Sequence, residues 1–137
     1  MNQLISFLSG QRDVGLLIGR IAGGLILLVA GYSKLFGAGF SGIISTFERM
    51  GIILPQVTGP FIALLEFFGG AAIIVGLLTR YLGVLFTIEF IVVLIFVKMG
   101  AQFNNLRIDV ALVGFGVLWA TQGGGRLALD RILKLER

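Results

Sequence analysis

The sequence contains no cysteine and no histidine, and charged residues make up only 13% of its 137 positions. A chain without these two residue types has no disulfides and no thiolate or imidazole ligands for zinc, iron–sulfur clusters or haem. It also has no Cys or His that could act as a nucleophile or base. We therefore expect no metal site and no covalently bound cofactor, so that any redox role needs a diffusible or partner-held cofactor.

What the sequence has in excess is apolar residues. They make up 57% of the chain, against about 45–50% in a typical soluble domain, and the mean hydropathy is +1.02. Such a chain has too little polar surface to cover itself in water, so the lipid bilayer is its expected surroundings. The net charge of +4 is scattered and the 12 Phe fall within apolar runs, which argues against binding to nucleic acid.

Four apolar runs, at 14–36, 60–79, 81–99 and 105–122, predict an all-α fold in which residues 1–137 form a single transmembrane four-helix bundle. The first run reaches about 34 Å as a helix, enough for a hydrocarbon core of about 30 Å, and the last reaches about 27 Å, the low end for a crossing. Residues 1–13 lack the pattern of a signal peptide, so the first run is expected to be a retained span. Short amphipathic helices at the membrane interface are expected within 37–59 and in the tail after residue 125.

An even number of spans places both termini on one side of the membrane. That side holds six basic residues and the other holds four, so the positive-inside rule predicts a multi-pass cell-membrane protein with both termini in the cytoplasm. The six are Arg12, Arg80, Arg126, Arg131, Lys134 and Arg137, and the four are Lys34, Arg49, Lys98 and Arg107.

Small residues recur every fourth position in the first run, at Gly15, Gly19 and Gly23. Such a face lets helix backbones approach closely in lipid. It either packs inside one chain or joins two chains as a homo-oligomer.

Two ionisable residues, Arg20 and Glu89, lie deep in the first and third runs. Groups at membrane depth are costly and face partners or a polar cavity. Counted at 1.5 Å per residue, they lie about 9 Å and about 12 Å above the inner edge, which predicts an Arg20–Glu89 ion pair. The pair either fixes helix register or handles protons or quinone.

Lys34, Glu66 and Asp109 fall together near the outer edge by the same count. Three such groups at one level suggest a site that binds a polar headgroup, in which Glu66 acts as a proton carrier. Lys34 taken alone also fits an ordinary lysine whose ammonium group extends to the interface.

Three stretches carry recognisable motifs: GYSKLFG at 31–37, LEFFGG followed by GLLTR within 65–80, and GGGRLALDR at 123–131. They resemble the G-x-x-K-L-F-G, L-E-x-x-G-G…G-L-x-T-R and G-x-G-R-x-S-x-D-R motifs of the DoxX family of small four-span bacterial and archaeal membrane proteins. Arg20 also matches an early arginine of that family.

The chain departs from the family pattern at three positions. Ala128 stands where serine is common, Glu89 has no counterpart in the pattern, and Asp109 stands where Glu often begins the last helix. An Arg20–Glu89 pair would therefore be special to this chain.

The resemblance implies membrane redox or quinone-linked work. The family takes its name from a subunit of an archaeal thiosulfate:quinone oxidoreductase, and other members resemble membrane anchors of redox complexes with a superoxide dismutase and a sulfurtransferase. We therefore expect a subunit of a quinone-linked or redox-associated membrane complex, at most an accessory subunit of an oxidoreductase, with redox proteins as partners. A non-catalytic scaffold or chaperone-like binding module and a small-molecule transporter are the alternatives.

Overall fold

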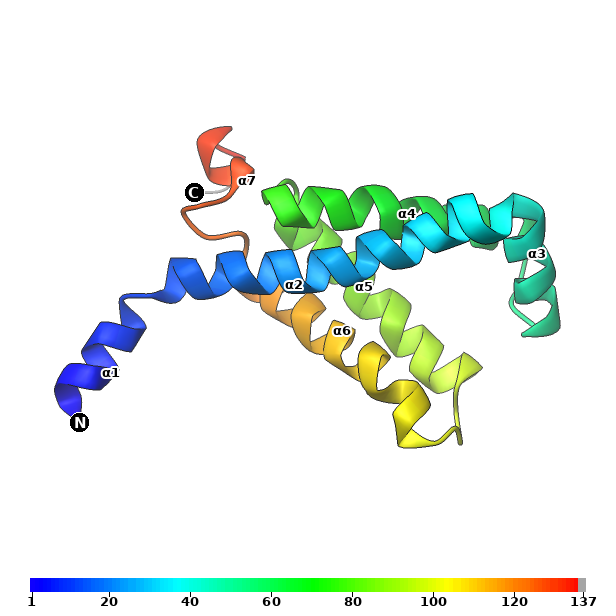
Figure 1. Cartoon of the computed structure of the whole chain (residues 1–137), viewed down its shortest axis with the longest axis horizontal. Helices are drawn as coiled ribbons and strands as arrows, with labels where there is room; N and C mark the ends of the chain where they lie inside the picture. The colour runs from blue at the N-terminus through cyan, green and yellow to red at the C-terminus, as the bar shows by residue number, and fades with distance from the viewer. Residues whose placement is uncertain (136–137) are drawn as a thin grey trace.

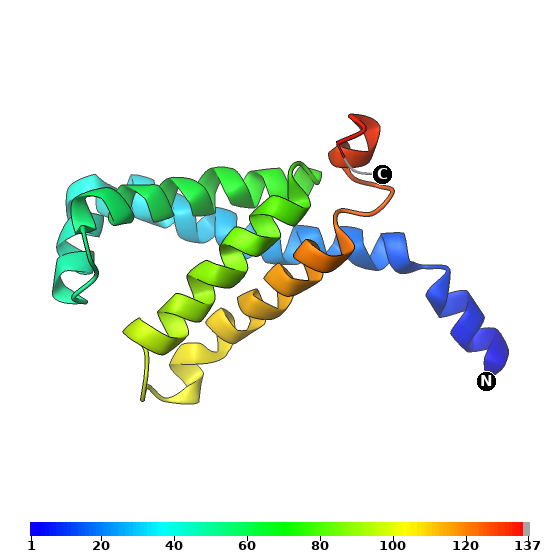
Figure 2. The same ribbon diagram turned by 180° about the vertical axis from the view of Figure 1, so that it is seen from behind.

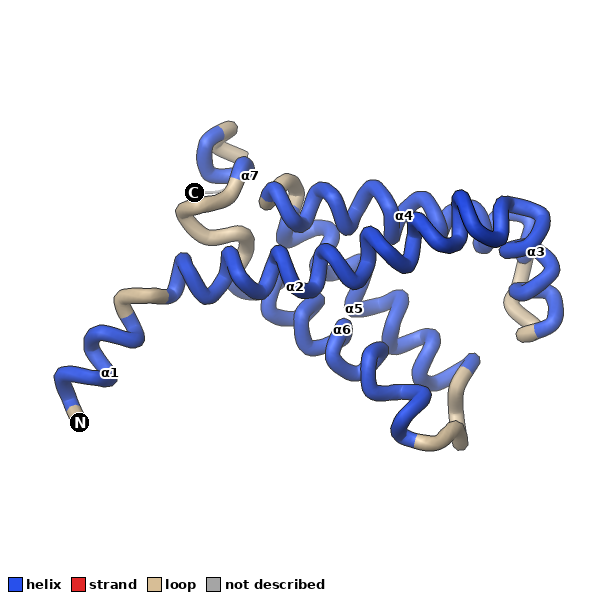
Figure 3. The backbone as a smooth tube through the Cα atoms, in the orientation of Figure 1, coloured by secondary structure: helices blue, strands red, loops and turns tan. Residues whose placement is uncertain are grey.

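Every regular element of the chain is helical, as the sequence predicts, in the computed structural model, which describes residues 1–135 (Figure 3). The α-helices are α1 (Asn2–Ser9), α2 (Arg12–Tyr32), α3 (Gly39–Arg49), α4 (Pro55–Val75), α5 (Thr79–Val92), α6 (Phe103–Gln122) and α7 (Leu129–Ile132). Two π-helical segments, η1 (Ser33–Ala38) and η2 (Val93–Val97), continue α2 and α5.

Within residues 1–135, three helical segments are long and apolar enough to cross a membrane: Arg12–Arg49, Pro55–Val75 and Thr79–Val97. The helix α6 has 20 residues, about 30 Å of length, and it packs along α5. Its length and packing support a fourth crossing, which stays a prediction.

The long helices form two antiparallel pairs. α2 packs against α4, α5 packs against α6, and contacts between the two pairs are few. Figures 1 and 2 show the pairs lying close together near the α4–α5 turn and diverging toward α3 and toward the α5–α6 connection. The bundle is therefore closed at one end and open at the other.

Glycines allow the close approach within each pair. A Cβ atom on Gly70 would lie 2.5 Å from the backbone nitrogen of Leu28 in α2, and one on Gly83 would lie 2.5 Å from that of Ala120 in α6. Backbones this close leave no room for a side chain, which is the helix contact that small residues provide in lipid.

The glycines of the repeat in the first span differ in how closely they pack against other helices. Gly23 lies against the Trp119 ring, where an added Cβ would be 2.6 Å away, whereas Gly15 has nothing within 4 Å among the described residues. Part of this face thus packs inside the chain, and its role in a homo-oligomer stays a prediction.

The core is small, and many large apolar side chains point outward. Leu27, Ile73, Phe86 and Trp119 are completely buried. By contrast, apolar residues along the long helices remain widely exposed, for example Phe68 at 62%. A soluble protein of this size would bury such side chains, whereas lipid solvates them.

The ends of several elements differ from the expected ones. α4 begins at Pro55, five residues earlier than the predicted span, so Pro60 lies inside the helix and Pro55 takes the first turn. A helix does lie between the first two spans, as predicted, but the tail forms only the four-residue α7. Arg137, counted above among the basic residues, lies outside the described residues.

The helix α1 was not expected. All its residues are exposed, and four of them are large and apolar: Leu4, Ile5, Phe7 and Leu8. A short helix with this character is typical of a segment that lies in the membrane interface.

Candidate functional site

The three residues predicted to bind a headgroup, Lys34, Glu66 and Asp109, line one cavity of about 170 Å³. Glu89 and Lys98 line it as well. The five charged groups come from both helix pairs, because Lys34 and Glu66 belong to the α2–α4 pair and the others to the α5–α6 pair. The cavity therefore lies between the two pairs, at membrane depth.

Each lysine of this cavity holds one carboxylate. The ammonium group of Lys34 donates to Oε2 of Glu66, and that of Lys98 donates to Oδ2 of Asp109 at 2.6 Å. The carboxylate side chains are only 5% and 10% exposed, whereas the lysines are 31% and 34% exposed. Two ion pairs thus face each other across the cavity, with their acidic members buried.

Glu89 is the third carboxyl group of the cavity, and neither Lys34 nor Lys98 forms an ion pair with it in the described part of the chain. Its carboxyl group lines the same cavity as that of Glu66, and the two groups interact electrostatically. Oε2 of Glu89 is buried without a hydrogen-bond partner among the described residues. This oxygen atom is therefore available to form a hydrogen bond with a ligand in the cavity.

The predicted Arg20–Glu89 ion pair is wrong, since no ion pair joins these two residues in the described part of the chain. Glu66 precedes the end of α4 by nine residues and Glu89 follows the start of α5 by ten, so both lie about 15 Å from the turn between these helices. Arg20 instead lies level with Ile74, close to that turn. The sequence estimate failed because it measured the depth of each residue from an assumed membrane edge.

Arg20 is completely buried and stabilises the closed end of the bundle. Its Nη1 donates to the carbonyl oxygen of Ile74 at 3.0 Å, and its Nη2 donates to that of Leu127 at 2.7 Å. The last carbonyls of a helix lack intrahelical partners, so a guanidinium group can join the end of α4 to the C-terminal tail.

Asp130 explains the third sequence motif in structural terms. Its carboxylate accepts the backbone N–H groups of Leu78 at 2.6 Å and Thr79 at 2.8 Å, and it is 3% exposed. These N–H groups begin α5, where a negative charge is favourable. Its charge also attracts the buried Arg20. The tail is thereby fixed against the α4–α5 turn, away from the charged cavity.

Both lysines of the cavity are placed by π-helical turns. Lys34 lies within η1, and Lys98 directly follows η2. Such turns are rare and are found frequently at functional sites. Because each one shifts the register of the residues that follow, the α2 and α5 helices turn their last charged residue toward the cavity.

A larger apolar cavity adjoins the charged one. It measures about 480 Å³ and lies between the α3–α4 connection and the end of α5. Met50, Ile52 and Val97 line both cavities. The two together present a charged compartment and an apolar one, the arrangement that suits a molecule with a polar head and an apolar tail.

The ligating groups of the site suit an organic headgroup. No three side chains of the kinds that bind metals are grouped to hold an ion anywhere in residues 1–135. The ammonium groups offer hydrogen-bond donors, and the carboxyl groups offer acceptors or, when protonated, donors.

Sequence reasoning missed Lys98. Its position in the sequence could have indicated its partner. Lys98 lies at the end of the third apolar run and Asp109 near the beginning of the fourth, so the two residues lie opposite each other across a short connection. Lys98 was instead counted only as a charge outside the membrane.

Comparisons with known proteins agree with the motifs. The DoxX family profile matches residues 15–99, more than half of the chain. A Bacillus subtilis protein named "Putative oxidoreductase CatD" is 37% identical over 119 residues, covering 86% of each chain. The inner membrane protein YqjF of Escherichia coli is 34% identical over 127 residues, covering 89% of this chain and 94% of its own.

A second Escherichia coli inner membrane protein, YphA, is 30% identical over 141 residues, with 96% of this chain and 99% of its own covered. No solved structure matches the chain. The apolar helices and the similarity to inner membrane proteins identify a membrane protein. The chain belongs to the DoxX family.

Proposed function

We propose that this chain binds the headgroup of a membrane quinone as a subunit of a redox-associated membrane complex. The observation that carries the proposal is the cavity between the two helix pairs, where two lysines and three carboxyl groups meet at membrane depth. Charges in this position are costly, and in membrane proteins they commonly mark substrate or proton pathways.

The residues of the cavity match the chemistry of a quinone headgroup. Lys34 and Lys98 are donors for the two carbonyl oxygens, which carry negative charge as the ring is reduced. Reduction of a quinone to a quinol takes up two electrons and two protons. Glu66 and Glu89, whose carboxyl groups line the same cavity, can pass protons to the ring oxygens, while the electrons come from a redox partner protein.

The apolar cavity has the character needed for the start of an isoprenoid tail. It is lined by Met50, Ile52, Ile53, Val92, Phe96 and Val97 among others. The two cavities, about 170 and 480 Å³, fall within the size range of small-molecule sites when taken together, about 300–1,000 Å³. The Bacillus subtilis relative is named a putative oxidoreductase, which agrees with a redox role for this chain.

The test is to purify the protein in mild detergent, extract it with organic solvent, and measure quinone per protein. Wild type is expected to retain quinone, and Glu66→Gln and Lys98→Gln are expected to lose most of it. Glu48→Gln is the matched control, because Glu48 lies on α3 and does not line the cavity.

Equal quinone in wild type and Glu66→Gln, or no quinone in either, would contradict the proposal. A reproducible protein partner found by cross-linking, together with no quinone, would favour the scaffold alternative instead.

A further inference from the structure

The N-terminal helix α1 (Asn2–Ser9) is not covered by any other element of the described chain. None of its residues is buried, and Figures 1 and 2 show it turning away from the axis of α2 instead of packing on the bundle. A helix of eight residues is not stable in water by itself, because isolated helices shorter than about 12–15 residues are marginal there. A surface outside the chain is therefore needed to stabilise α1.

The residues of α1 separate into an apolar face and an uncharged polar face. The large apolar side chains, which are 57–63% exposed, are those of Leu4, Ile5, Phe7 and Leu8. The opposite side of the helix carries Asn2, Ser6 and Ser9, which recur at the spacing i, i+4, i+7. Residues 2–9 include no ionisable side chain. The helix is thus amphipathic without being charged.

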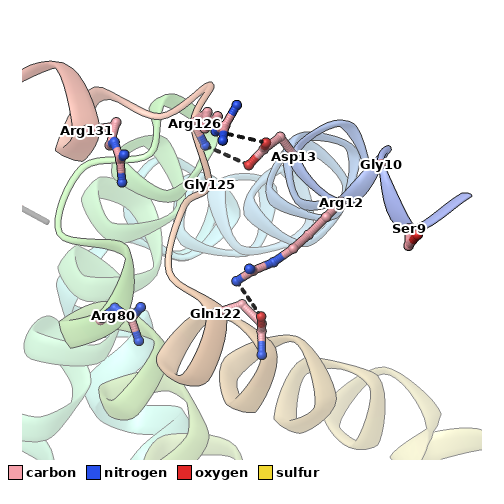
Figure 4. Close-up of a pocket in the computed structure, with 9 residues that line it drawn as sticks. All are labelled: Ser9, Gly10, Arg12, Asp13, Arg80, Gln122, Gly125, Arg126 and Arg131. Atoms are coloured by element: carbon pink, nitrogen blue, oxygen red, sulfur yellow. Dashed lines mark hydrogen bonds and ion pairs between the residues drawn. The ribbon is translucent and has the colours of Figure 1, made fainter. Parts of the chain in front are cut away.

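The start of α2 is fixed to the rest of the bundle, and this determines where α1 lies. Nη2 of Arg12 donates to Oε1 of Gln122 at 2.6 Å, and a carboxylate oxygen of Asp13 accepts the backbone N–H of Arg126 at 2.9 Å (Figure 4). These contacts join the first turn of α2 to the end of α6 and to the tail. Only two residues separate this turn from α1, so α1 lies beside the closed end of the bundle.

The closed end is also where the first membrane-spanning segment begins. α1 directly precedes Arg12–Arg49, which is long and apolar enough to cross a membrane. A helix that turns aside at the start of such a segment lies along the membrane surface. Outward-facing apolar side chains follow at once in α2, with Val14 43% and Ile18 62% exposed. The apolar face of α1 is therefore continuous along the chain with the lipid-facing surface of α2.

A second copy of the chain fits the apolar face less well than lipid does. Eight residues of helix span about 12 Å, whereas a stable interface between proteins buries about 800 Å² on each partner. So short a helix cannot supply that area. The membrane interface requires no minimum area and accepts a helix that has one apolar face.

We propose that α1 lies flat in the membrane interface, with its apolar face among the acyl chains and its Ser and Asn side chains in the headgroup layer. Binding of an interfacial helix depends on buried apolar area and on attraction to anionic lipids, and it is sensitive to lipid composition. Because the side chains of α1 carry no charge, the apolar area decides its binding. α1 therefore responds to how loosely the lipids are packed and not to their charge.

The experiment measures the accessibility of spin labels on the full chain in nanodiscs of dioleoylphosphatidylcholine. The chain has no cysteine, so single labels can be attached to the variants Leu4→Cys, Leu8→Cys, Asn2→Cys and Ser6→Cys. The ratio of oxygen to nickel-chelate accessibility is expected to be several-fold higher for the first two variants than for the last two. The same difference is expected when part of the lipid is dioleoylphosphatidylglycerol, and a smaller one in gel-phase dipalmitoylphosphatidylcholine, whose chains are tightly packed.

Two double variants test whether the apolar face is responsible. With the label at Phe7→Cys, the variant Leu4→Gln/Ile5→Gln is expected to lower the accessibility ratio several-fold. The matched control is Asn2→Gln/Ser6→Gln on the polar face, which is expected to leave the ratio unchanged. Since α1 has no buried residue, both variants should elute like wild type in gel filtration.

Equal ratios on the two faces would overturn the proposal, as would a difference that appears only with phosphatidylglycerol. An undiminished difference in gel-phase lipid would overturn the dependence on lipid packing. Dipolar broadening at Leu8→Cys in nanodiscs that hold two copies, and not in those that hold one, would assign the apolar face to a second copy instead. None of these outcomes depends on quinone at the charged cavity.

Discussion

Replacing Asp130 with alanine should destabilise the protein by about 3 kcal/mol. Its carboxylate accepts two backbone N–H groups at 2.6 and 2.8 Å, and it is 3% exposed. Loss of an exposed helix cap costs about 0.5–2 kcal/mol, whereas two charge-assisted hydrogen bonds are together worth about 3–6 kcal/mol. Because Asp130 is buried, its loss should cost more than the loss of an exposed cap. Water that enters the vacated space can hydrogen-bond to the two N–H groups, so the cost should be about 3 kcal/mol, the lower end of the range for two charge-assisted hydrogen bonds.

Asp130→Asn should cost about half as much, because the amide keeps one acceptor oxygen but loses the charge that attracts Arg20. The matched control is Asp13→Ala at the same end of the molecule. Asp13 is partly exposed, faces an Arg126 side chain that is 81% exposed and accepts one backbone N–H, that of Arg126 at 2.9 Å. Its loss should therefore cost about 1 kcal/mol, less than the loss of the buried Asp130.

The assay is unfolding in mixed micelles with increasing SDS, followed by the fluorescence of Trp119. This is the chain's single tryptophan, and it is completely buried in the folded protein, so its emission reports loss of the core. Asp130→Ala within about 0.5 kcal/mol of wild type, or no more destabilised than Asp13→Ala, would refute the role given to the tail.

Three further predictions follow from the helix pairs and the cavity. Gly70→Leu should abolish folding, because the added Cβ atom would lie 2.5 Å from the backbone of α2. Gly37→Ala should be tolerated, because a Cβ atom there would have nothing within 4 Å among the described residues. The yield of each variant after gel filtration in detergent is the measurement, and equal yields would contradict the close helix contact. The chain has no cysteine, so Asn104→Cys should react with an impermeant maleimide in intact cells and Lys134→Cys only after lysis; the same reactivity for both would contradict four crossings. Glu89→Gln should raise the unfolding midpoint slightly, because it removes a buried ionisable group from the cavity that also holds the Glu66 carboxylate, and it should lower retained quinone. A lower midpoint would contradict this interpretation of Glu89.

Hydropathy predicted the helical fold and most of each long helix. A run of about 20 apolar residues that crosses a bilayer must pair its backbone groups internally, and an α-helix does this within one segment. Depth counting placed Lys34, Glu66 and Asp109 near one level, and all three line one cavity, although Glu66 lies in the middle of α4 and not near its end. The same counting failed for Arg20, which it placed level with Glu89 but which lies beside Ile74, close to the α4–α5 turn.

The partners of Arg20 could not be predicted. They are the backbone carbonyl groups of Ile74 and Leu127. Every residue has such a group, so the sequence does not show which carbonyl groups accept from Arg20. The two π-helical turns, which orient Lys34 and Lys98, also have no sequence signature of their own. The division of the helices into two pairs also could not be predicted. It depends on close contacts at glycines, and the glycine positions in the sequence are compatible with several ways of pairing the helices.

The central claim, that a quinone headgroup binds between the helix pairs, is tested most directly by photolabelling in native membranes with an azidoquinone. Its label is expected on peptides that contain Met50, Ile52 or Val97, which line both cavities. An excess of unlabelled quinone should prevent this labelling, and Glu66→Gln should lose it. Labelling spread over the lipid-facing surface, or unaffected by excess quinone, would contradict the claim.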